Sequence, residues 1–172
     1  MTSAIEVRDG APGETDAVRE VTLAAYQQYA ADLPPPFWEA YRGNILATLA
    51  RPEPAAQIVA VLAGAIAGAV LLYPGDAAVF TGGQGPPPMR WPEVRLLAVA
   101  PSARGHGVGE ALMADCVARA RRAGAVRLAL HTTPMMAAAL RLYTRMGFAR
   151  APELDFSPAP GFDVHGYTLV LG

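Results

Sequence analysis

The stretch LLAVAPSARGHGVG, residues 96–109, decides the fold of this chain. It completes an apolar run, residues 93–99, that has the length of a buried central strand. Pro101 ends that strand, because proline cannot donate to a β-ladder and disfavours helix in the residue before it. From Val108 onward, apolar residues recur at helical spacing. The stretch therefore predicts a strand, a tight turn and the start of a helix.

Three glycines alternate in that turn, at Gly105, Gly107 and Gly109. Glycine adopts backbone dihedrals that other residues avoid, and it lets a ligand approach the backbone closely. Successive amide N–H groups can then point into one concavity at the helix N-terminus, which favours a phosphate. The turn is therefore predicted to bind phosphate.

Two other phosphate-binding signatures are excluded. A Walker loop requires a lysine, and the chain contains none. The dinucleotide fingerprint requires a further glycine three residues after the second, but Glu110 and Leu112 occupy the two positions in question. The remaining pattern is Arg/Gln-x-x-Gly-x-Gly/Ala, formed here by Arg104, Gly107 and Gly109.

The elements on both sides of the turn follow from apolar spacing and from the positions of proline and glycine. Before the turn we expect a strand at 5–8, a helix from Thr15 or Asp16 to about Tyr29, a helix at 37–49, a hairpin of strands 57–62 and 66–72, and a loop at 73–91. After it we expect a helix from 108 ended by Gly124, a strand at 126–131, a helix begun by Pro134 and ended near Met146, and closing strands at Phe148 and 166–171. The long loop is either a wall over a substrate pocket or a disordered excursion.

Composition narrows the class of protein. With 172 residues, 52% of them hydrophobic, and no internal repeat, the chain is expected to form one globular domain, residues 1–172. A net charge of -1 argues against nucleic acid as a partner. The apolar run at 58–73 is too short to span a membrane and fits a buried hairpin better.

Cysteine use and the N-terminus bear on metal binding and location. Cys116 is the sole cysteine, so neither an internal disulfide nor a cysteine zinc cluster is expected, and no metal is implied. Glu6, Arg8 and Asp9 interrupt the N-terminal residues, which is incompatible with a secretory signal. We therefore expect a cytoplasmic protein.

Two motifs resemble the GNAT superfamily of N-acetyltransferases. The first is LLAV followed by ARGHGVG, and the second is AALRLYTRMGF, residues 138–148, one helix and one strand further on. The resemblance implies an α/β (α+β) fold in which a mixed, mostly antiparallel sheet splays at its central strands and carries helices on both faces. It also implies that acyl-CoA, most simply acetyl-CoA, lies in the opening.

The resemblance also implies which residues contact the coenzyme. Backbone groups of one strand segment would pair with the pantetheine arm, and the amides of the turn would hold the pyrophosphate. Met136 stands where relatives commonly have a coenzyme-binding asparagine, so one hydrogen bond is expected to be lost there. The side chain of His106 either reaches a phosphate or faces solvent. The implied coenzyme residues are Leu97, Ala98, Val99, Arg104, Gly105, His106, Gly107, Val108, Gly109 and Met136.

The expected chemistry is attack of an unprotonated amine on a thioester, which needs a base and a donor to the developing oxyanion. By resemblance the donor is a backbone amide near Val99, and the Tyr143 hydroxyl protonates the departing thiolate. Glu93 is the candidate base, directly or through water. Many relatives have a glutamate where this chain has Arg95, so the base could instead lie elsewhere or be ordered water, and Glu93 could be a solvated carboxylate. His131 is expected to be structural or exposed.

The sequence therefore predicts an acyl-CoA-dependent N-acyltransferase that acetylates a primary amine of a small molecule in a ternary complex. A non-catalytic acyl-CoA sensor and an enzyme that acetylates a protein amine are the alternatives; a structural protein with a merely sharp turn is a third. The acceptor is expected to contact residues 29–38, 81–91 and 155–165. Such folds often form homodimers, and the sequence does not decide this.

Overall fold

The computed structural model describes residues 3–77 and 89–172, so part of the predicted loop at 73–91 and of the acceptor segment 81–91 lies outside the described residues. The described chain forms two compact units. The first comprises Met1–Leu72 and Leu96–Asp115, and the second comprises Tyr73–Arg95 and Cys116–Gly172. Each unit is considered by itself below.

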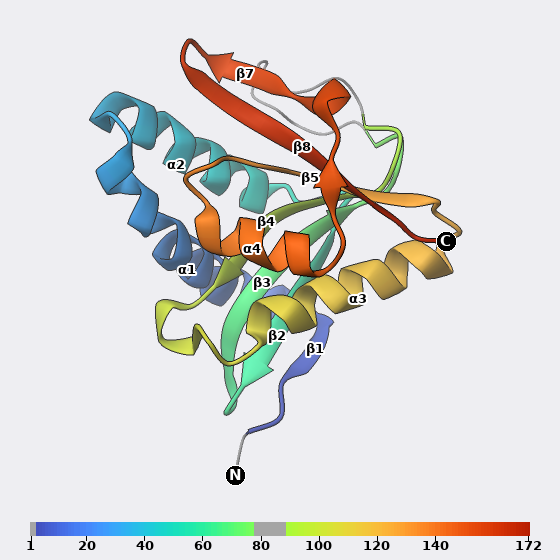
Figure 1. The fold of residues 1–172 in the computed structure, drawn as a ribbon. Helices are drawn as coiled ribbons and strands as arrows, with labels where there is room; N and C mark the ends of the chain where they lie inside the picture. Colours follow the sequence, from blue (N-terminus) through green and yellow to red (C-terminus); the bar gives the residue numbers. More distant parts are fainter. Residues whose placement is uncertain (1–2, 78–88) are drawn as a thin grey trace. The chain divides into compact units, whose positions relative to one another are not determined.

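The first unit contains an antiparallel sheet of β1 (Glu6–Asp9), β2 (Ala56–Leu62) and β3 (Ala65–Tyr73), whose last residue already belongs to the second unit (Figure 1). The hairpin between β2 and β3 turns at Ala63 and Gly64, which have φ values of 51° and 81°. Positive φ at both central residues matches the twist of the paired strands, so the predicted hairpin is confirmed.

The helices of the first unit are α1 (Thr15–Tyr26) and α2 (Pro35–Ala50), joined by a 3₁₀ segment over Gln27–Asp32. Val18, Val21, Thr22, Ala25 and Tyr26 form the buried face of α1, as their helical spacing predicts. The core of β2 is also buried, since Ile58, Val59 and Ala60 are 0% exposed.

A close contact at Gly68 fixes β3 against the segment that carries the predicted phosphate turn. A Cβ built at Gly68 would lie 2.7 Å from Val108 Cγ1 and 2.8 Å from the carbonyl oxygen of Ala98. No side chain fits at those distances, so glycine is required here. Beyond Val99, the amide of Ala100 donates to Ala67 O at 2.8 Å, which holds the start of the turn on β3.

The second unit contains β5 (Arg127–Thr132), β8 (Phe162–Val170), β6 (Ala149–Arg150), β7 (Phe156–Ala159) and helix α4 (Ala137–Arg145). The first residues of β4 (Glu93–Val99) pair in parallel with β5, through Glu93↔Ala129 and Val94↔Leu130. The long strand β8 pairs antiparallel with β5, β6 and β7. Figure 1 shows β7 beside β8, whose opposite end leads to the C-terminus.

Hydrogen-bonded neighbours follow the order β1-β2-β3-β4-β5-β8-β6, with β7 paired to β8. The β4–β5 pair is parallel, the β1–β2, β2–β3, β5–β8, β6–β8 and β7–β8 pairs are antiparallel, and the four α-helices of the described residues complete an α+β fold. The predicted fold class is confirmed. The predicted strand at 93–99 coincides with β4, and Gly124, at φ 76°, ends α3 (Val108–Arg122) as expected.

Several predicted boundaries are wrong for local reasons. Helix α1 ends at Tyr26 because residues 27–32 tighten into a 3₁₀ segment. Pro35 opens α2 and does not precede it, since the first turn of a helix needs no amide donor. Pro134 lies in a turn closed by Met136 N and Thr133 O at 3.0 Å, so α4 begins only at Ala137. Strand β7 and the first half of β8 were missed.

Among the described residues no helix is long and apolar enough to cross a membrane. The same residues contain no group of three or more His, Cys, Asp or Glu side chains that could hold a metal ion.

Candidate active site

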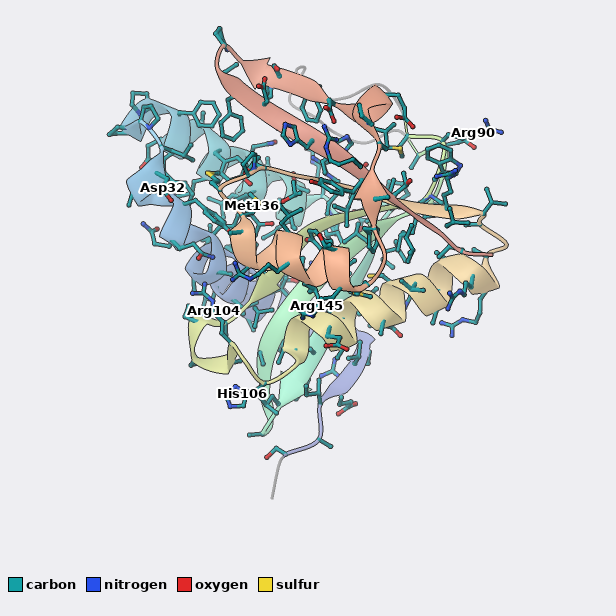
Figure 2. The ribbon with its side chains drawn as sticks, viewed as in Figure 1. Asp32, Arg90, Arg104, His106, Met136 and Arg145 are labelled. Carbon is teal, nitrogen blue, oxygen red and sulfur yellow. The ribbon has the colours of Figure 1, made fainter. Side chains whose placement is uncertain are left out.

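The predicted phosphate turn lies in the first unit, between β4 and α3 (Figure 2). Gly105 and Gly107 have φ values of 78° and 84°, a region that residues with a Cβ rarely adopt. Among the described residues, nothing lies within 4 Å of a Cβ built at Gly105, and only Ile5 Cδ1, at 3.9 Å, does so at Gly107. The space that a side chain would occupy at these two glycines is therefore open.

The open turn leads into α3, a helix of 15 residues. Its first amide groups have no partner within the helix, and they carry the positive end of the helix dipole. The regular backbone hydrogen bonds of the helix begin with Ala111 N, which donates to Gly107 O at 3.0 Å. Val108 is 1% exposed and anchors the helix start in the core, so the amides before Ala111 are held in place for an anion.

The side chain of Arg104 contacts the end of α1. Its Nη2 donates to Ala25 O, at the end of α1, at 3.4 Å. Burial raises the pKa of Tyr29, and the positive charge of Arg104 partly opposes that rise. Arg104 therefore links the turn to α1.

His106 is exposed, and its Nδ1 lies 3.0 Å from Arg104 O and 3.2 Å from Ala103 O. Carbonyl oxygens only accept hydrogen bonds, so Nδ1 carries a proton. Figure 2 shows the ring of His106 at the outer end of the turn. The neutral ring thus presents a bare Nε2, which can donate to a phosphate only after it is protonated.

The predicted pantetheine segment follows in β4. Ala98 is 2% exposed, and Leu97 and Val99 are half-buried. Leu96, just before them, has φ 52°, which is uncommon for a residue other than glycine and interrupts the regular extended backbone of the strand. Strained residues of this kind gather at functional sites, and the sequence carried no signal for this one.

The predicted base, Glu93, lies in the second unit and is buried, with 4% of its surface exposed. Its Oε1 lies 2.8 Å from Nδ1 of His131 on the neighbouring strand β5. The other ring nitrogen, Nε2, lies 2.8 Å from Leu154 O. The interpretation of Glu93 as a solvated strand-end carboxylate is therefore wrong, because the parallel pairing of β4 with β5 buries its side chain against His131.

The hydrogen bonds of His131 determine how many protons the pair holds. Leu154 O can only accept, so Nε2 must carry a proton. A hydrogen bond between Nδ1 and Glu93 Oε1 then needs one more proton, located either on the ring or on the carboxyl group. The pair is thus either imidazolium with carboxylate or neutral imidazole with carboxylic acid. The Phe156 ring meets the imidazole edge-on, with centroids 5.2 Å apart.

A second cluster holds the Leu154 carbonyl in place. Arg150 donates to both oxygens of Asp155, at 2.8 and 2.7 Å, and also to Gly166 O at 2.8 Å. Asp155 Oδ1 accepts in turn from Gly166 N at 2.8 Å. The pKa of Asp155 is lowered to about 2, chiefly by its hydrogen bonds to Arg150. This clasp fixes the 3₁₀ turn Pro152–Leu154 that provides the acceptor for His131.

The predicted thiolate-protonating residue, Tyr143, is buried on α4 with 6% of its surface exposed. Its ring lies 5.9 Å from that of Phe148, so the residue packs in the core, and its predicted role in the reaction stays a prediction. Met136, at the other end of the helix, is half-buried and directly precedes α4. Figure 2 shows Met136 and Arg145 at the two ends of α4. A thioether accepts hydrogen bonds only weakly, in keeping with the expected loss of one bond there.

An α+β fold with an open glycine turn at a helix N-terminus is suited to a transferase whose coenzyme carries phosphates. The chain belongs to the Acetyltransferase (GNAT) family, because the family model of that description matches residues 16–148. Membership of this family makes acetyl transfer the activity to test.

Individual relatives agree with this assignment. The chain is 31% identical to a mycothiol acetyltransferase from Cellulomonas flavigena, over 96% of this chain and 47% of that protein, so it spans about half the length of this curated relative. Two solved structures share the fold. A GNAT family acetyltransferase from Brucella melitensis in complex with acetyl-CoA has a TM-score of 0.63 and 21% identity, covering 99% of this chain and 90% of that one. PaiA N-acetyltransferase from Thermoplasma acidophilum in complex with coenzyme A has a TM-score of 0.70 and 14% identity, covering 97% and 99%.

Proposed function

We propose that this enzyme transfers the acetyl group of acetyl-CoA to a primary amine of a small molecule, by direct attack within a ternary complex. The observation that carries the proposal is the open turn at Gly105 and Gly107, whose positive φ values free the backbone amides ahead of α3. Those amides bind the coenzyme's pyrophosphate. Backbone groups of Leu97, Ala98 and Val99 pair with its pantetheine arm, and Met136 contacts it without an amide hydrogen bond.

In the proposed reaction the amine nitrogen attacks the thioester carbonyl carbon, and the carbon–sulfur bond then breaks. Glu93 accepts the proton that the amine must lose, directly or through one water. A backbone amide near Val99 stabilises the oxyanion. Tyr143 gives a proton to the coenzyme thiolate that leaves. For Glu93 to act as base, the extra proton of its pair must reside on His131, so that the carboxylate is ionised.

The proposal of a small-molecule acceptor is supported by the name of one relative. The 31% identical protein from Cellulomonas flavigena is named for acetylation of mycothiol, which is a small molecule. A protein amine as acceptor, and an acyl-CoA sensor without turnover, predict different outcomes in the following experiment. A homodimer is compatible with each of these.

The proposal is tested by measuring release of free CoA thiol from acetyl-CoA with a panel of small primary amines and peptides with free N-termini. We expect turnover with at least one small amine and less with the peptides. Calorimetry with acetyl-CoA alone runs in parallel. Binding without thiol release for any acceptor would replace the enzyme by a sensor, and absence of binding would leave only a structural role for the turn.

A further inference from the structure

Arg95 lies on β4 two residues after the proposed base, Glu93. Side chains alternate between the two faces of a strand, so Glu93 and Arg95 lie on the same face, and Val94, with 3% of its surface exposed, points to the other. A cation therefore stands beside the proposed base, at a spacing of roughly 7 Å between the two Cα atoms.

Arg95 is half-buried, and one nitrogen of its guanidinium is buried without an acceptor. Its Nη1 is inaccessible to solvent and has no hydrogen-bond partner among the described residues. The group lies over the ring of Tyr73, with Cζ 5.7 Å from the ring centroid. A ring face attracts the charge but accepts no in-plane N–H, so the stacking leaves the Nη1 donor unpaired, which is unfavourable in a protein interior.

Two other arginines of the second unit show what such a stacked group ordinarily does. Arg127 lies 5.6 Å from the ring centroid of Trp91, and its Nη1 donates to Thr168 Oγ1 at 3.0 Å. Cζ of Arg150 lies 5.4 Å from the ring centroid of Tyr167, and the Arg150 guanidinium donates to Asp155 and Gly166. Both of these stacked guanidiniums have acceptors in the protein, whereas Nη1 of Arg95 has none among the described residues.

Further unpaired polar groups lie next to the Glu93–His131 pair along the chain. The hydroxyl oxygens of Thr132 and Thr133, directly after His131, are buried and have no hydrogen-bond partner among the described residues. The two residues are 4% and 6% exposed. Buried polar side chains are usually hydrogen-bonded, so these hydroxyls are unusual. Side chains alternate along β5, so Thr132 lies on the face opposite His131 and does not add to the site beside Arg95.

We propose that Arg95 binds a carboxylate carried by the acceptor, which is therefore an amino acid or another amine with an acidic group. A planar guanidinium is suited to a planar carboxylate, which can accept two parallel hydrogen bonds. This inference rests on the proposed function, since it places the acceptor's amine at Glu93 on the same strand face. It explains why a cation occupies this position of β4.

The test compares ω-amino acids with their carboxamides as acceptors: glycine, β-alanine and 4-aminobutyrate, each against its amide. We expect the wild type to prefer the best acid by about tenfold or more in kcat/KM, the usual scale of a hydrogen bond to a charged group. Arg95→Met should reduce that preference to near unity. Because the amides have less basic amines, the informative quantity is the change in the acid-to-amide ratio between the two proteins.

Arg127→Met is the matched control, since it also removes an arginine stacked on an aromatic ring in the same unit. It should leave the ratio unchanged, and circular dichroism should show both variants folded. Acetyl-CoA affinity, measured by calorimetry, should be the same in wild type and Arg95→Met. A wild type without acid preference, an unchanged ratio in Arg95→Met, or a loss confined to coenzyme affinity would each overturn the proposal.

Ligand-observed NMR separates this inference from the proposed function. With CoA present, 4-aminobutyrate should bind the wild type and not Arg95→Met. Its amide should bind the wild type and Arg95→Met with the same affinity. If no amine is acetylated but this binding pattern holds, the carboxylate site stands and the acetyl transfer fails. If binding of the acid is the same in both proteins, Arg95 is not an anion site, whatever the turnover.

Discussion

Oε1 of Glu93 and Nδ1 of His131 lie 2.8 Å apart, within hydrogen-bond distance. Leu154 O holds the opposite ring nitrogen at 2.8 Å and so fixes the orientation of the ring. Both side chains are nearly enclosed, with 5% and 10% of their surfaces exposed. The carboxylate of the proposed base is therefore held in one position by a partner that also determines where its proton resides.

Replacing Glu93 by glutamine tests the base directly. The glutamine amide can still donate to a neutral Nδ1 of His131, so the fold should be kept while the basic oxygen is lost. We expect kcat to fall about 100-fold or more, the usual scale for a positioned base, with acetyl-CoA affinity unchanged. Steady-state kinetics and calorimetry measure the two effects. An unchanged kcat would move the base to another residue or to water.

The location of the shared proton can be measured in the unmodified enzyme. We expect nitrogen-15 shifts of His131 at neutral pH to show both ring nitrogens protonated, because Glu93 must be ionised to accept a proton. In Glu93→Gln the same spectrum should show protonation at Nε2 alone, since Leu154 O still requires it. A wild-type ring protonated only at Nε2 would assign the proton to Glu93 and argue against its role as base.

Tyr143→Phe removes only the hydroxyl from a residue that packs against Phe148. If the hydroxyl protonates the thiolate, kcat should fall by about 10- to 100-fold, with coenzyme affinity and thermal stability nearly unchanged. Phe148→Leu is the matched control, because it loosens the same packing without touching the hydroxyl. Equal losses of kcat and stability in both variants would assign Tyr143 to the core alone.

Gly107→Ala tests the coenzyme turn. Alanine at φ 84° strains the backbone by about 1–2 kcal/mol and displaces the amides from their present orientation. We expect the Kd for CoA to rise by about tenfold. Gly161→Ala is the control, because Gly161 has a similar φ of 77° and open space around it, but lies between β7 and β8. Equal CoA affinity in the two variants would count against the pyrophosphate assignment.

Local patterns in the sequence were enough to predict β4, the β2–β3 hairpin and the glycine turn. Alternating glycines, proline positions and apolar spacing act over a few residues, and these elements depend on little else. The same patterns identified the glycine turn as a candidate phosphate site, whereas Glu93 and Tyr143 became candidates through the resemblance to the GNAT superfamily. All of these roles stay predictions.

His131 shows what local patterns miss. Its partner Glu93 is 38 residues away in the sequence, and the two meet only because β4 and β5 pair in parallel at Glu93↔Ala129. Register between distant strands leaves no short-range signal. For the same reason the sequence did not indicate the clasp of Arg150 and Asp155 or the unpaired donor of Arg95. Strand β7 was missed because Pro158 and Pro160 made its segment resemble a loop.

Gly68→Ala should destabilise the protein although alanine is small. The added Cβ would meet Val108 Cγ1 at 2.7 Å and Ala98 O at 2.8 Å, and a backbone oxygen cannot move aside easily. Overpacking of this kind costs about 1–3 kcal/mol, which urea unfolding would measure. Gly43→Ala, in α2 with no neighbour within 4 Å among the described residues, should instead stabilise by about 0.5–1 kcal/mol. A stable Gly68→Ala would contradict the close packing of β3.

Acidification should lower the free energy of unfolding, because two carboxylates that stabilise the folded state become protonated. The pKa of Asp155 is lowered to about 2 by Arg150 and Gly166 N, and that of Glu14 is lowered to about 2 by Arg8 and Ala11 N. A lowered pKa in the folded state means that each ionised group stabilises the fold above its ordinary pKa. That stabilisation is lost as the pH falls from about 4 towards about 2.

Urea midpoints measured at pH values between about 6 and about 3 should therefore fall with acidification, and Asp155→Asn should flatten part of that fall. The variant should also lose some kcat, because the Asp155 clasp holds the turn whose Leu154 carbonyl accepts from His131. Glu14→Gln should also reduce the fall of the urea midpoint with acidification, independently of Asp155. It should leave kcat unchanged, since its partner Arg8 lies in β1. If Asp155→Asn kept full kcat, the clasp would stabilise the fold without positioning His131.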